Sequence, residues 1–362
     1  MMPRTIRRAS NSKPLMDIRT VAQRANVSIA TVSRTINRVP TVNPKIAKRV
    51  WEAINELGYF PNTQARALGS GRSGIFGLIV SDISNPFFPE LVQGFEDVAV
   101  ESGYEILVSS TNYDRARMES CIRRMLERKA EGVAVMTFGV EQPIFDKLIE
   151  RNVPLVFVDA GPDKPTISLL KVDYHHGIRQ GVQHLAALGH RNIAFISGPA
   201  ELVSAQARIT AFRRSLAECG IPILESRIVQ GDHTLEGGMA AADTLLVATN
   251  RPTAIMCSND MTAMGVLHKA YRKRLSVPAD LSVIGFDDIT MSRVVIPPLT
   301  SIQMSRVELA RTAVKALRAH VEGTPHQREY KIGTQLVVRE STSFPPGSMK
   351  DLPSSYHAGF SA

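Results

Sequence analysis

Apolar residues between Val21 and Ile36 recur with the spacing of two short helices. Val21 and Ala25 lie four positions apart, Val32 and Ile36 repeat that spacing, and Val27 follows the break between the two pairs. Residues four positions apart lie on the same face of a helix, so each segment has one narrow apolar stripe. The pattern predicts a helix, a tight turn and a second helix, with the two stripes facing each other.

The second helix of this pair has an outer face of small side chains. Ser28 is a good N-cap for it. The residues on its first turn or outer face are Ile29, Ala30, Thr31, Ser33 and Arg34. Small side chains let a helix enter the major groove of DNA, and an arginine reaches the edge of a guanine. The pattern therefore favours a DNA-recognition helix over its alternative, a helical hairpin with no role in binding nucleic acid.

A third helix is predicted after this motif. Asp17 caps the first helix, Asn43 and Pro44 begin the third, and Gly58 ends it. The apolar positions of the third helix are Ile46, Val50, Ile54 and Leu57. Trp51, the only tryptophan, is expected to pack within this small core rather than to bind a ligand.

Residues 61–74, PNTQARALGSGRSG, join the helical head to the rest of the chain. They predict one short helix, Thr63 to Leu68, followed by a Gly/Ser linker. A helix of about six residues is not stable alone in water, so we expect it to form only against DNA and a symmetry mate. A GxGxxG match at the end of this segment precedes the strand 75–80, whereas a dinucleotide fingerprint follows a strand. That match is therefore discounted.

From Ile75 the chain alternates apolar strands with amphipathic helices. The expected strands are IFGLIV, YEILVSS, GVAVMTF and PLVFVDA in a first series, then NIAFISG, RIVQGD, AIMCSN and LSVIGFDD. Apolar strands separated by helices are typical of parallel sheets covered on both faces. The predicted fold is an α/β core of two doubly wound parallel-sheet lobes with an N-terminal all-α helix-turn-helix domain.

The domain boundaries follow from these patterns. In chain order we expect a disordered basic extension (1–15), the helix-turn-helix domain (16–60), the hinge helix and linker (61–74), the core (75–342) and a loose tail (343–362). Within the core, lobe 1 is expected at about 75–173 plus 303–331, and lobe 2 at about 174–302 plus 332–342.

Charge is distributed unevenly along the chain. Residues 1–74 hold 13 Lys and Arg against 3 Asp and Glu, a net +10, whereas the remaining 288 hold 30 against 31, a net −1. A basic, compact head favours the phosphate backbone of double-stranded DNA as its partner over a membrane surface. No apolar run long enough to span a bilayer occurs. We expect a cytoplasmic protein in which Cys121, Cys219 and Cys257 are buried thiols.

The head resembles the beginning of proteins of the lactose-repressor (LacI/GalR) family. The resemblance is carried by VAQRANVSIATVSRTIN, then Tyr59, Pro61 and the ARAL run, and it extends over about 16–340. It implies that the core is like that of periplasmic binding proteins. The chain departs from the family at Thr20, where Asp is usual, and at Asn26, where Gly is usual. Asn tolerates the left-handed backbone that a tight turn needs.

This resemblance implies a hinge helix in which Leu68 is an apolar wedge that opens a base step from the minor groove. Together with the helix pattern, it assigns DNA binding to Thr20, Ser28, Ile29, Ala30, Thr31, Ser33, Arg34, Asn37, Asn62, Ala65, Arg66 and Leu68.

Polar and aromatic side chains follow the predicted strands. Ligands of open α/β sheets bind beyond the carboxyl ends of the strands, although one aspartate there is more often a turn or helix cap. The motifs NPFF, CSND and IGFDD, and an arginine nine residues after GP, resemble the effector pocket of the family. The resemblance implies an effector-binding set of Phe87, Phe88, Asp159, Asp173, Arg208, His233, Asn259 and Asp287.

Within that set, Arg208 and Asp287 are expected to hold ligand hydroxyls or a carboxylate, and Asp159 and Asn259 to add polar contacts. Phe87 or Phe88 would line the apolar side. Charge-assisted partners suit the hydroxyls of a sugar, and an aromatic ring suits its C–H face. The chain departs from relatives at His233, where an aromatic is frequent, and at Leu202, where purine-binding members have an arginine.

No enzyme signature occurs: there is no GxSxG, HExxH, Walker loop or paired cysteine set. His175 and His176 are adjacent, so on a helix they diverge by about 100° and make a poor metal pair. We expect neither cofactor nor metal. The rival interpretations are a sugar-processing enzyme and a binding protein of periplasmic type, and the basic head counts against both.

The sequence thus predicts a transcriptional regulator, in the first place a repressor, that responds to a small-molecule effector. One recognition helix reads a half-site, so a homodimer on a near-palindromic operator is expected, and a tetramer is left open. The effector is expected to be a sugar or sugar derivative. The alternatives are a nucleobase or other metabolite, and a regulator that depends on a co-repressor or activates transcription.

Overall fold

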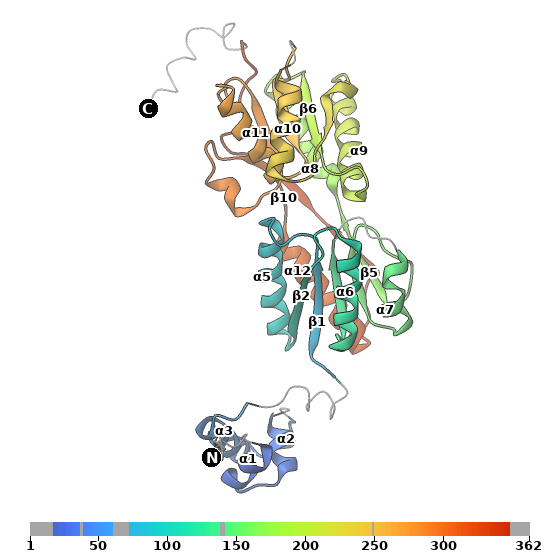
Figure 1. The fold of residues 1–362 in the computed structure, drawn as a ribbon, viewed down its shortest axis with the longest axis vertical. Helices are drawn as coiled ribbons and strands as arrows, with labels where there is room; N and C mark the ends of the chain where they lie inside the picture. Colours follow the sequence, from blue (N-terminus) through green and yellow to red (C-terminus); the bar gives the residue numbers. More distant parts are fainter. Residues whose placement is uncertain (1–16, 37–38, 61–71, 138–141, 248–249, 348–362) are drawn as a thin grey trace, which may run out of the picture. The chain divides into compact units, whose positions relative to one another are not determined.

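The computed structural model describes residues 17–36, 39–60, 72–137, 142–247 and 250–347. They form two compact units, a helical head and an α/β core, which divide between Ser73 and Gly74 (Figure 1). The predicted hinge helix, Thr63 to Leu68, lies outside the described residues. No described helix has the length and apolar character needed to cross a membrane.

The described part of the head contains three helices: α1 (Ile18–Ala25), α2 (Ile29–Ile36) and α3 (Pro44–Leu57). Asp17 caps α1 by accepting a hydrogen bond from the backbone N–H of Thr20 at 2.9 Å. The turn between α1 and α2 contains Asn26 in the left-handed conformation, with φ 52°. The predicted helix-turn-helix is therefore confirmed. Trp51, which was expected to pack, is only partly covered, because 39% of it is exposed.

The small core of the head comes from the predicted stripes. Its buried members are Val21, Ala22, Ala25, Val32, Val50, Ala53 and Ile54. Val27, Ile36 and Leu57 pack against them while half-buried. One face of each helix is thus used for packing, which leaves the outer face of α2 free of that constraint.

The core contains two six-stranded sheets. The first has the order β11-β5-β4-β3-β1-β2, and its strands are β1 (Ile75–Val80), β2 (Glu105–Ser110), β3 (Gly132–Met136), β4 (Leu155–Val158), β5 (Ile167–Val172) and β11 (Glu329–Ile332). The second has the order β12-β10-β9-β8-β6-β7, with β6 (Ile193–Ser197), β7 (Ile228–Gln230), β8 (Ala254–Cys257), β9 (Ser282–Asp287), β10 (Thr300–Met304) and β12 (Thr334–Val337).

Helices cover both faces of each sheet (Figure 1). The helices packed with the first sheet are α5 (Phe87–Glu101), α6 (Arg115–Glu127), α7 (Asp146–Glu150, after a 3-10 turn at Gln142–Phe145) and α12 (Arg306–Glu322). Those packed with the second are α8 (Tyr174–Ala187), α9 (Val203–Glu218), α10 (Leu235–Leu246) and α11 (Asp260–Arg272), with short 3-10 turns at Glu225–Arg227 and Thr290–Arg293.

Alternation along the strands explains the two apolar layers. In β1, Phe76 and Leu78 belong to the apolar cluster that includes residues of α5 and α12, whereas Ile79 belongs to the cluster with α6. Successive side chains of a strand point to opposite faces, so one strand supplies both layers. This arrangement confirms the two doubly wound α/β lobes.

Three connections join the lobes: β5 to α8, β10 to α12, and β11 to β12. Thr334, at the last of them, donates a hydrogen bond to the Asp173 carbonyl at 2.5 Å and accepts one from the Gly177 N–H at 2.9 Å. The first and third connections are thereby tied together. β12 runs antiparallel to β10 at the edge of the second sheet, while the other strand pairs of the two described sheets are parallel.

Two expectations about the core are wrong at one residue each. Residues 348–362 of the expected loose tail lie outside the described residues, but the first residue of that tail, Ser343, is held in place, because the Ser343 N–H donates to the Ser282 hydroxyl at 3.0 Å and the Ser343 carbonyl lies 2.8 Å from Nε2 of the buried His190. Both partners lie in lobe 2 and fix the chain against it. Cys121 and Cys257 are buried, but Cys219, just after α9, is only half-buried.

Candidate DNA-recognition helix and interlobe cluster

The outer face of α2 has the exposure that a recognition helix requires. Ser28, Ala30 and Arg34 are exposed, and Ile29 is 46% exposed. The guanidinium of Arg34 has no hydrogen-bond or ion-pair partner within the described part of the chain. Its donors are therefore available to an external acceptor.

The remaining predicted DNA-binding residues of the head also hold its local structure. Ser28 caps α2, since its hydroxyl accepts from the Thr31 N–H at 3.1 Å and lies 2.9 Å from the Thr31 hydroxyl. Thr20 is half-buried and its hydroxyl donates to Asp17 at 3.0 Å, while Ser33 is half-buried. The other predicted contacts lie outside the described residues; they are Asn37, Asn62, Ala65, Arg66 and Leu68.

Arg208 is the centre of a polar cluster between the two lobes. It lies on α9 and is only 3% exposed. Its guanidinium carbon is 4.9 Å from the centre of the Tyr174 ring and 4.3 Å from that of Phe286. Nη1 donates to the Ser258 carbonyl at 3.0 Å, whereas Nε has no partner among the described residues. A cation held between two aromatic rings keeps its charge and donors in a fixed position.

Asp159 connects the lobes through Tyr174. It follows β4 in lobe 1, and its Oδ2 accepts a hydrogen bond from the Tyr174 hydroxyl of lobe 2 at 2.6 Å. Burial raises the pKa of Asp159, which the hydrogen bonds from Tyr174 and from the Val172 N–H partly offset. Burial, and then the charge of Asp159, raise the pKa of Tyr174 well above its ordinary value, so this hydroxyl keeps its proton and donates it.

Asp287, at the end of β9, is buried near Arg208. Burial raises its pKa to about 8, and the charge of Arg208 acts in the opposite direction. At neutral pH the carboxyl is mostly protonated, so it can both donate and accept hydrogen bonds. The backbone carbonyl of Asp287 accepts from Nη1 of Arg306 at 2.5 Å, and φ at Asp287 is 106°, in the region that side chains rarely adopt.

His233 and Asn259 belong to the same neighbourhood. Burial lowers the pKa of His233 to about 3, with Arg208 acting in the same direction, so the ring is neutral. Its Nε2 has no partner within the described residues, and a Cβ on Gly198 would collide with it. Asn259 uses both ends of its amide: Oδ1 caps α11 through the Thr262 N–H, and Nδ2 donates to the His233 carbonyl, each at 2.9 Å. Asn259 thus positions His233.

The other predicted effector residues lie in more ordinary surroundings. Both carboxylate oxygens of Asp173 are engaged, one with the His176 N–H at 3.0 Å and the other with Lys331 Nζ at 2.8 Å. Phe87 and Phe88 begin α5 and are buried in an edge-to-face pair, with ring centres 5.2 Å apart. Both phenylalanines are therefore core residues that pack beneath the lobe 1 side of the interlobe cluster.

Three aromatic residues of this region were not predicted from the sequence. Tyr174 and Phe286 hold Arg208, and half-exposed Tyr113 of lobe 1 lies within electrostatic reach of Asp287 and Arg208. Tyr174 follows the predicted strand end at Asp173, and Phe286 lies within the IGFDD motif. Position alone would therefore have identified these two. Among the described residues no group of three or more His, Cys, Asp or Glu side chains could hold a metal ion.

Comparison with known proteins agrees with this geometry. Residues 17–62 match the model of bacterial regulatory proteins of the lacI family, and residues 182–342 match a periplasmic binding protein-like domain. The catabolite control protein A of Priestia megaterium is 35% identical over 325 residues, which span 87% of this chain and 98% of that protein. The repressor PurR of Photobacterium profundum is 31% identical over 326 residues, spanning 90% and 98%.

A solved structure gives the same result. The lac repressor dimer bound to operator and the anti-inducer ONPF has a TM-score of 0.79 at 28% identity, with 91% of this chain and 99% of that one covered. Head and core are thus both shared with regulators that act on DNA. The chain therefore belongs to the lacI family of bacterial regulatory proteins and is a DNA-binding transcriptional repressor, not an enzyme.

Proposed function

We propose that operator affinity in this repressor is set by an uncharged polyhydroxylated effector, a sugar or sugar derivative, bound at the interlobe cluster around Arg208. In this proposal the protein acts in the cytoplasm as a homodimer on a near-palindromic operator. Arg34 reads a base edge, and the hinge residues Asn62, Ala65, Arg66 and Leu68 act at the centre of the site.

The observation that carries the proposal is the unpaired hydrogen-bonding capacity around Arg208. Nε of Arg208, Nε2 of His233 and the hydroxyl of Ser258 are buried without a partner among the described residues. Buried polar groups in proteins are nearly always paired, so a cluster of unpaired ones indicates a ligand position. A ligand with several hydroxyl groups can both donate to and accept from such a set.

The charges favour an uncharged ligand. Arg208 contributes one positive charge and half-buried Asp159 offsets it, while Asp287 is mostly protonated near neutral pH and His233 is neutral. An anion would gain from Arg208 but would meet Asp159, and a cation would meet Arg208. Hydroxyl groups are compatible with all four side chains, because each can accept from or donate to an alcohol.

The cluster is also placed to sense lobe geometry. The Asp159–Tyr174 hydrogen bond spans the lobes, and Glu90 of α5 accepts from the Thr290 N–H of lobe 2 at 2.9 Å. A ligand shifts the balance between lobe arrangements only by the difference in its affinity for them, typically ~1 to 3 kcal/mol. That difference would change DNA affinity by about 5- to 150-fold.

A thermal-shift screen of the full chain against sugars, sugar acids and nucleobases would identify the effector, because specific binding raises the melting temperature. The proposal is then tested by titrating operator complexes of the parent, Arg208→Ala and Asp287→Ala with that ligand. Both variants should bind operator like the ligand-free parent and lose the response. Asp243→Ala is the matched control, because Asp243 lies on α10, pairs with Lys269 and Lys273 of lobe 2, and does not belong to the interlobe cluster, so this variant should respond like the parent.

Three results would contradict the proposal. Variants that respond with the parent's midpoint would place the effector elsewhere. If only a sugar acid or a nucleobase raised the melting temperature, the effector would not be an uncharged polyhydroxylated compound. Loss of folding in both variants, measured by circular dichroism, would support a purely structural role for Arg208 and Asp287, and Asp287→Asn would then repeat the test with less disturbance.

A further inference from the structure

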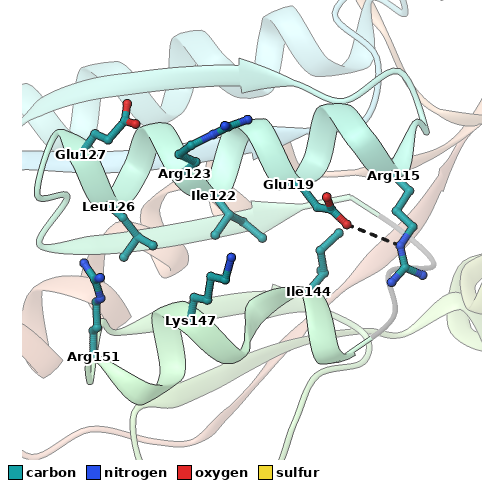
Figure 2. A pocket seen from close by; sticks show the side chains of 9 residues that line it. All are labelled: Arg115, Glu119, Ile122, Arg123, Leu126, Glu127, Ile144, Lys147 and Arg151. Carbon is teal, nitrogen blue, oxygen red and sulfur yellow. Dashed lines mark ion pairs between the residues drawn. The ribbon is translucent and has the colours of Figure 1, made fainter.

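A groove of about 700 Å³ runs between α6 and α7 on the surface of lobe 1, formed by residues of lobe 1 alone (Figure 2). It is lined by α6 from Arg115 to Glu127 and by the α7 region from Ile144 to Arg151. With a rise of ~1.5 Å per residue, the α6 side is ~18 Å long. The groove is therefore elongated and matches about three turns of a helix.

Positive charge dominates the lining. The groove is lined by four cationic side chains, those of Arg115, Arg123, Lys147 and Arg151, and by two carboxylates, those of Glu119 and Glu127. The side chains of Lys147 and Arg151 make no hydrogen bond or ion pair with any residue that the structure describes, and they extend toward α6 (Figure 2). Two cationic side chains without partners among the described residues, on the same wall of a groove, favour an external anionic group.

The bottom of the groove is apolar. Ile122 is only 3% exposed and forms the floor, and half-buried Leu126 and Ile144 flank it (Figure 2). Ile122 and Leu126 are one helical turn apart, so they present a short apolar stripe between the charged rims. A free phosphate or a flat polyanion would leave this stripe uncovered.

We propose that this groove binds an acidic amphipathic helix of another protein. Apolar side chains of that helix, one turn apart, would rest on Ile122 and Leu126, and its flanking carboxylates would pair with Lys147 and Arg151. Such helix-in-groove recognition needs an apolar stripe with charge complementarity at its edges, and both are present here.

The charges of the chain count against two other occupants. Residues 1–16 carry Arg4, Arg7, Arg8 and Lys13 and no acidic residue, so the protein's own N-terminal segment would be repelled. Nucleic acid would meet the carboxylates of Glu119 and Glu127 along the α6 side. An acidic peptide can place apolar side chains beside both glutamates, whereas a phosphate backbone cannot.

The test measures fluorescence anisotropy of a labelled amphipathic peptide of about 12 residues, with leucines one turn apart and glutamates on both sides. The full chain and Lys147→Glu/Arg151→Glu are compared, and Arg117→Glu/Arg128→Glu is the matched control. Arg117 and Arg128 are exposed cations on or next to α6, and neither lines the groove. The control keeps the same net charge and the same basic head.

We expect the groove variant to bind the peptide roughly tenfold more weakly than the control variant, which should bind like the parent. A second, scrambled peptide has the same composition, but its leucines are moved so that they are no longer one turn apart. Its affinity for the parent protein should be as low as the affinity of the original peptide for the groove variant. Lys147→Gln/Arg151→Gln should show a smaller loss in the same direction, and it replaces the charge reversal if that variant fails to fold.

Three outcomes would overturn the proposal. Equal weakening of the groove and control variants would mean that only overall charge matters. If the parent protein bound the scrambled peptide as tightly as the original one, Ile122 and Leu126 would have no part in recognition. Competition by a mixed-sequence DNA duplex that is lost in the groove variant but kept in the control would identify the groove as a polyanion site.

Discussion

The candidate site of the head and that of the core each contain one arginine, and the two arginines lie in opposite environments. Arg34 lies on the exposed face of α2 without a partner among the described residues, whereas Arg208 is buried between Tyr174 and Phe286. The guanidinium group is therefore exposed to solvent in the head and shielded from it in the core. This difference in exposure determines how strongly electrostatic interactions and hydrogen bonds act at each site.

In the head, charges are screened and act collectively. An exposed charge contributes little in any one contact, but many phosphates and many cations together give strong, salt-dependent binding. In the core, burial makes each polar group costly if it is left unpaired and strong if it is paired. A few buried polar groups around Arg208 would therefore be enough to discriminate between ligands. In the head, by contrast, affinity for DNA would come from many weak contacts between cations and phosphates.

The largest expected effect comes from ionic strength. Raising salt from about 50 to 200 mM should weaken binding of the full chain to duplex DNA by roughly 10³-fold, because cations from two heads displace counterions from the phosphates. Effector affinity should change by less than about threefold, since the groups around Arg208 are shielded from salt by burial.

Filter binding or anisotropy measures the first effect, and calorimetry with the effector from the screen measures the second. The two slopes are compared on the same preparation. If the affinities for DNA and for effector fell equally steeply with salt concentration, the effector would be bound by exposed charges. The two arginines would then not differ in the way described above.

Local patterns predicted the head and most of the strands, although they missed β5 and β11 of the first sheet. The stripe of Val21, Ala25 and Val32 is buried as expected, and Ser28 caps α2. These features depend on neighbours within a few residues, so sequence spacing is enough. Trp51 shows the limit, because its exposure depends on how much core three short helices can offer.

Features that depend on close approach between distant segments were missed. The helix α10 was not predicted, since Gly237 and Gly238 weaken its helical pattern. The reason for Gly238 appears only in three dimensions: a Cβ there would lie 2.3 Å from the Thr262 carbonyl oxygen of α11. The sequence gives no sign of which helix approaches so closely.

The interlobe cluster was predicted in part for the same reason. Strand ends and motifs identified Arg208, Asp159 and Asp287, and the charge of Arg208 acts to lower the pKa of both carboxyls. They did not show that Asn259 has both ends of its amide engaged, nor that Asp173 is paired with Lys331. Those contacts come from segments far apart in the chain.

An intermediate effect is expected at the recognition helix. Arg34→Ala should lose roughly 1 to 3 kcal/mol on the preferred operator and relax the preference at one base pair in each half-site, because an arginine pairs with guanine through two donors. Competition with operators that carry single-base changes measures this. An equal loss on every sequence would show that Arg34 contacts only phosphate.

The smallest expected effect sharpens the buried side of the comparison and concerns pH. The folded protein raises the pKa of Asp287 to about 8 from an ordinary value of 3.8, mainly through burial. Between those two values the folded state holds a proton that the unfolded state has lost, so Asp287 makes the free energy of unfolding fall as pH rises from about 4 to 8.

Asp287→Asn has an amide in place of the carboxyl and cannot lose this proton. The variant should therefore gain stability relative to the parent on going from pH 5 to pH 8, by at least ~1 kcal/mol, or about 2 to 4 °C in melting temperature. Burial also acts on Asp173, but its hydrogen bond with Lys331 leaves the pKa lowered, so Asp173→Asn should show no such trend above pH 5 and serves as the control. Melting curves of the three proteins at pH 5, 6.5 and 8 decide the matter, and parallel curves for parent and Asp287→Asn would mean that the carboxyl of Asp287 is already ionised in the folded core.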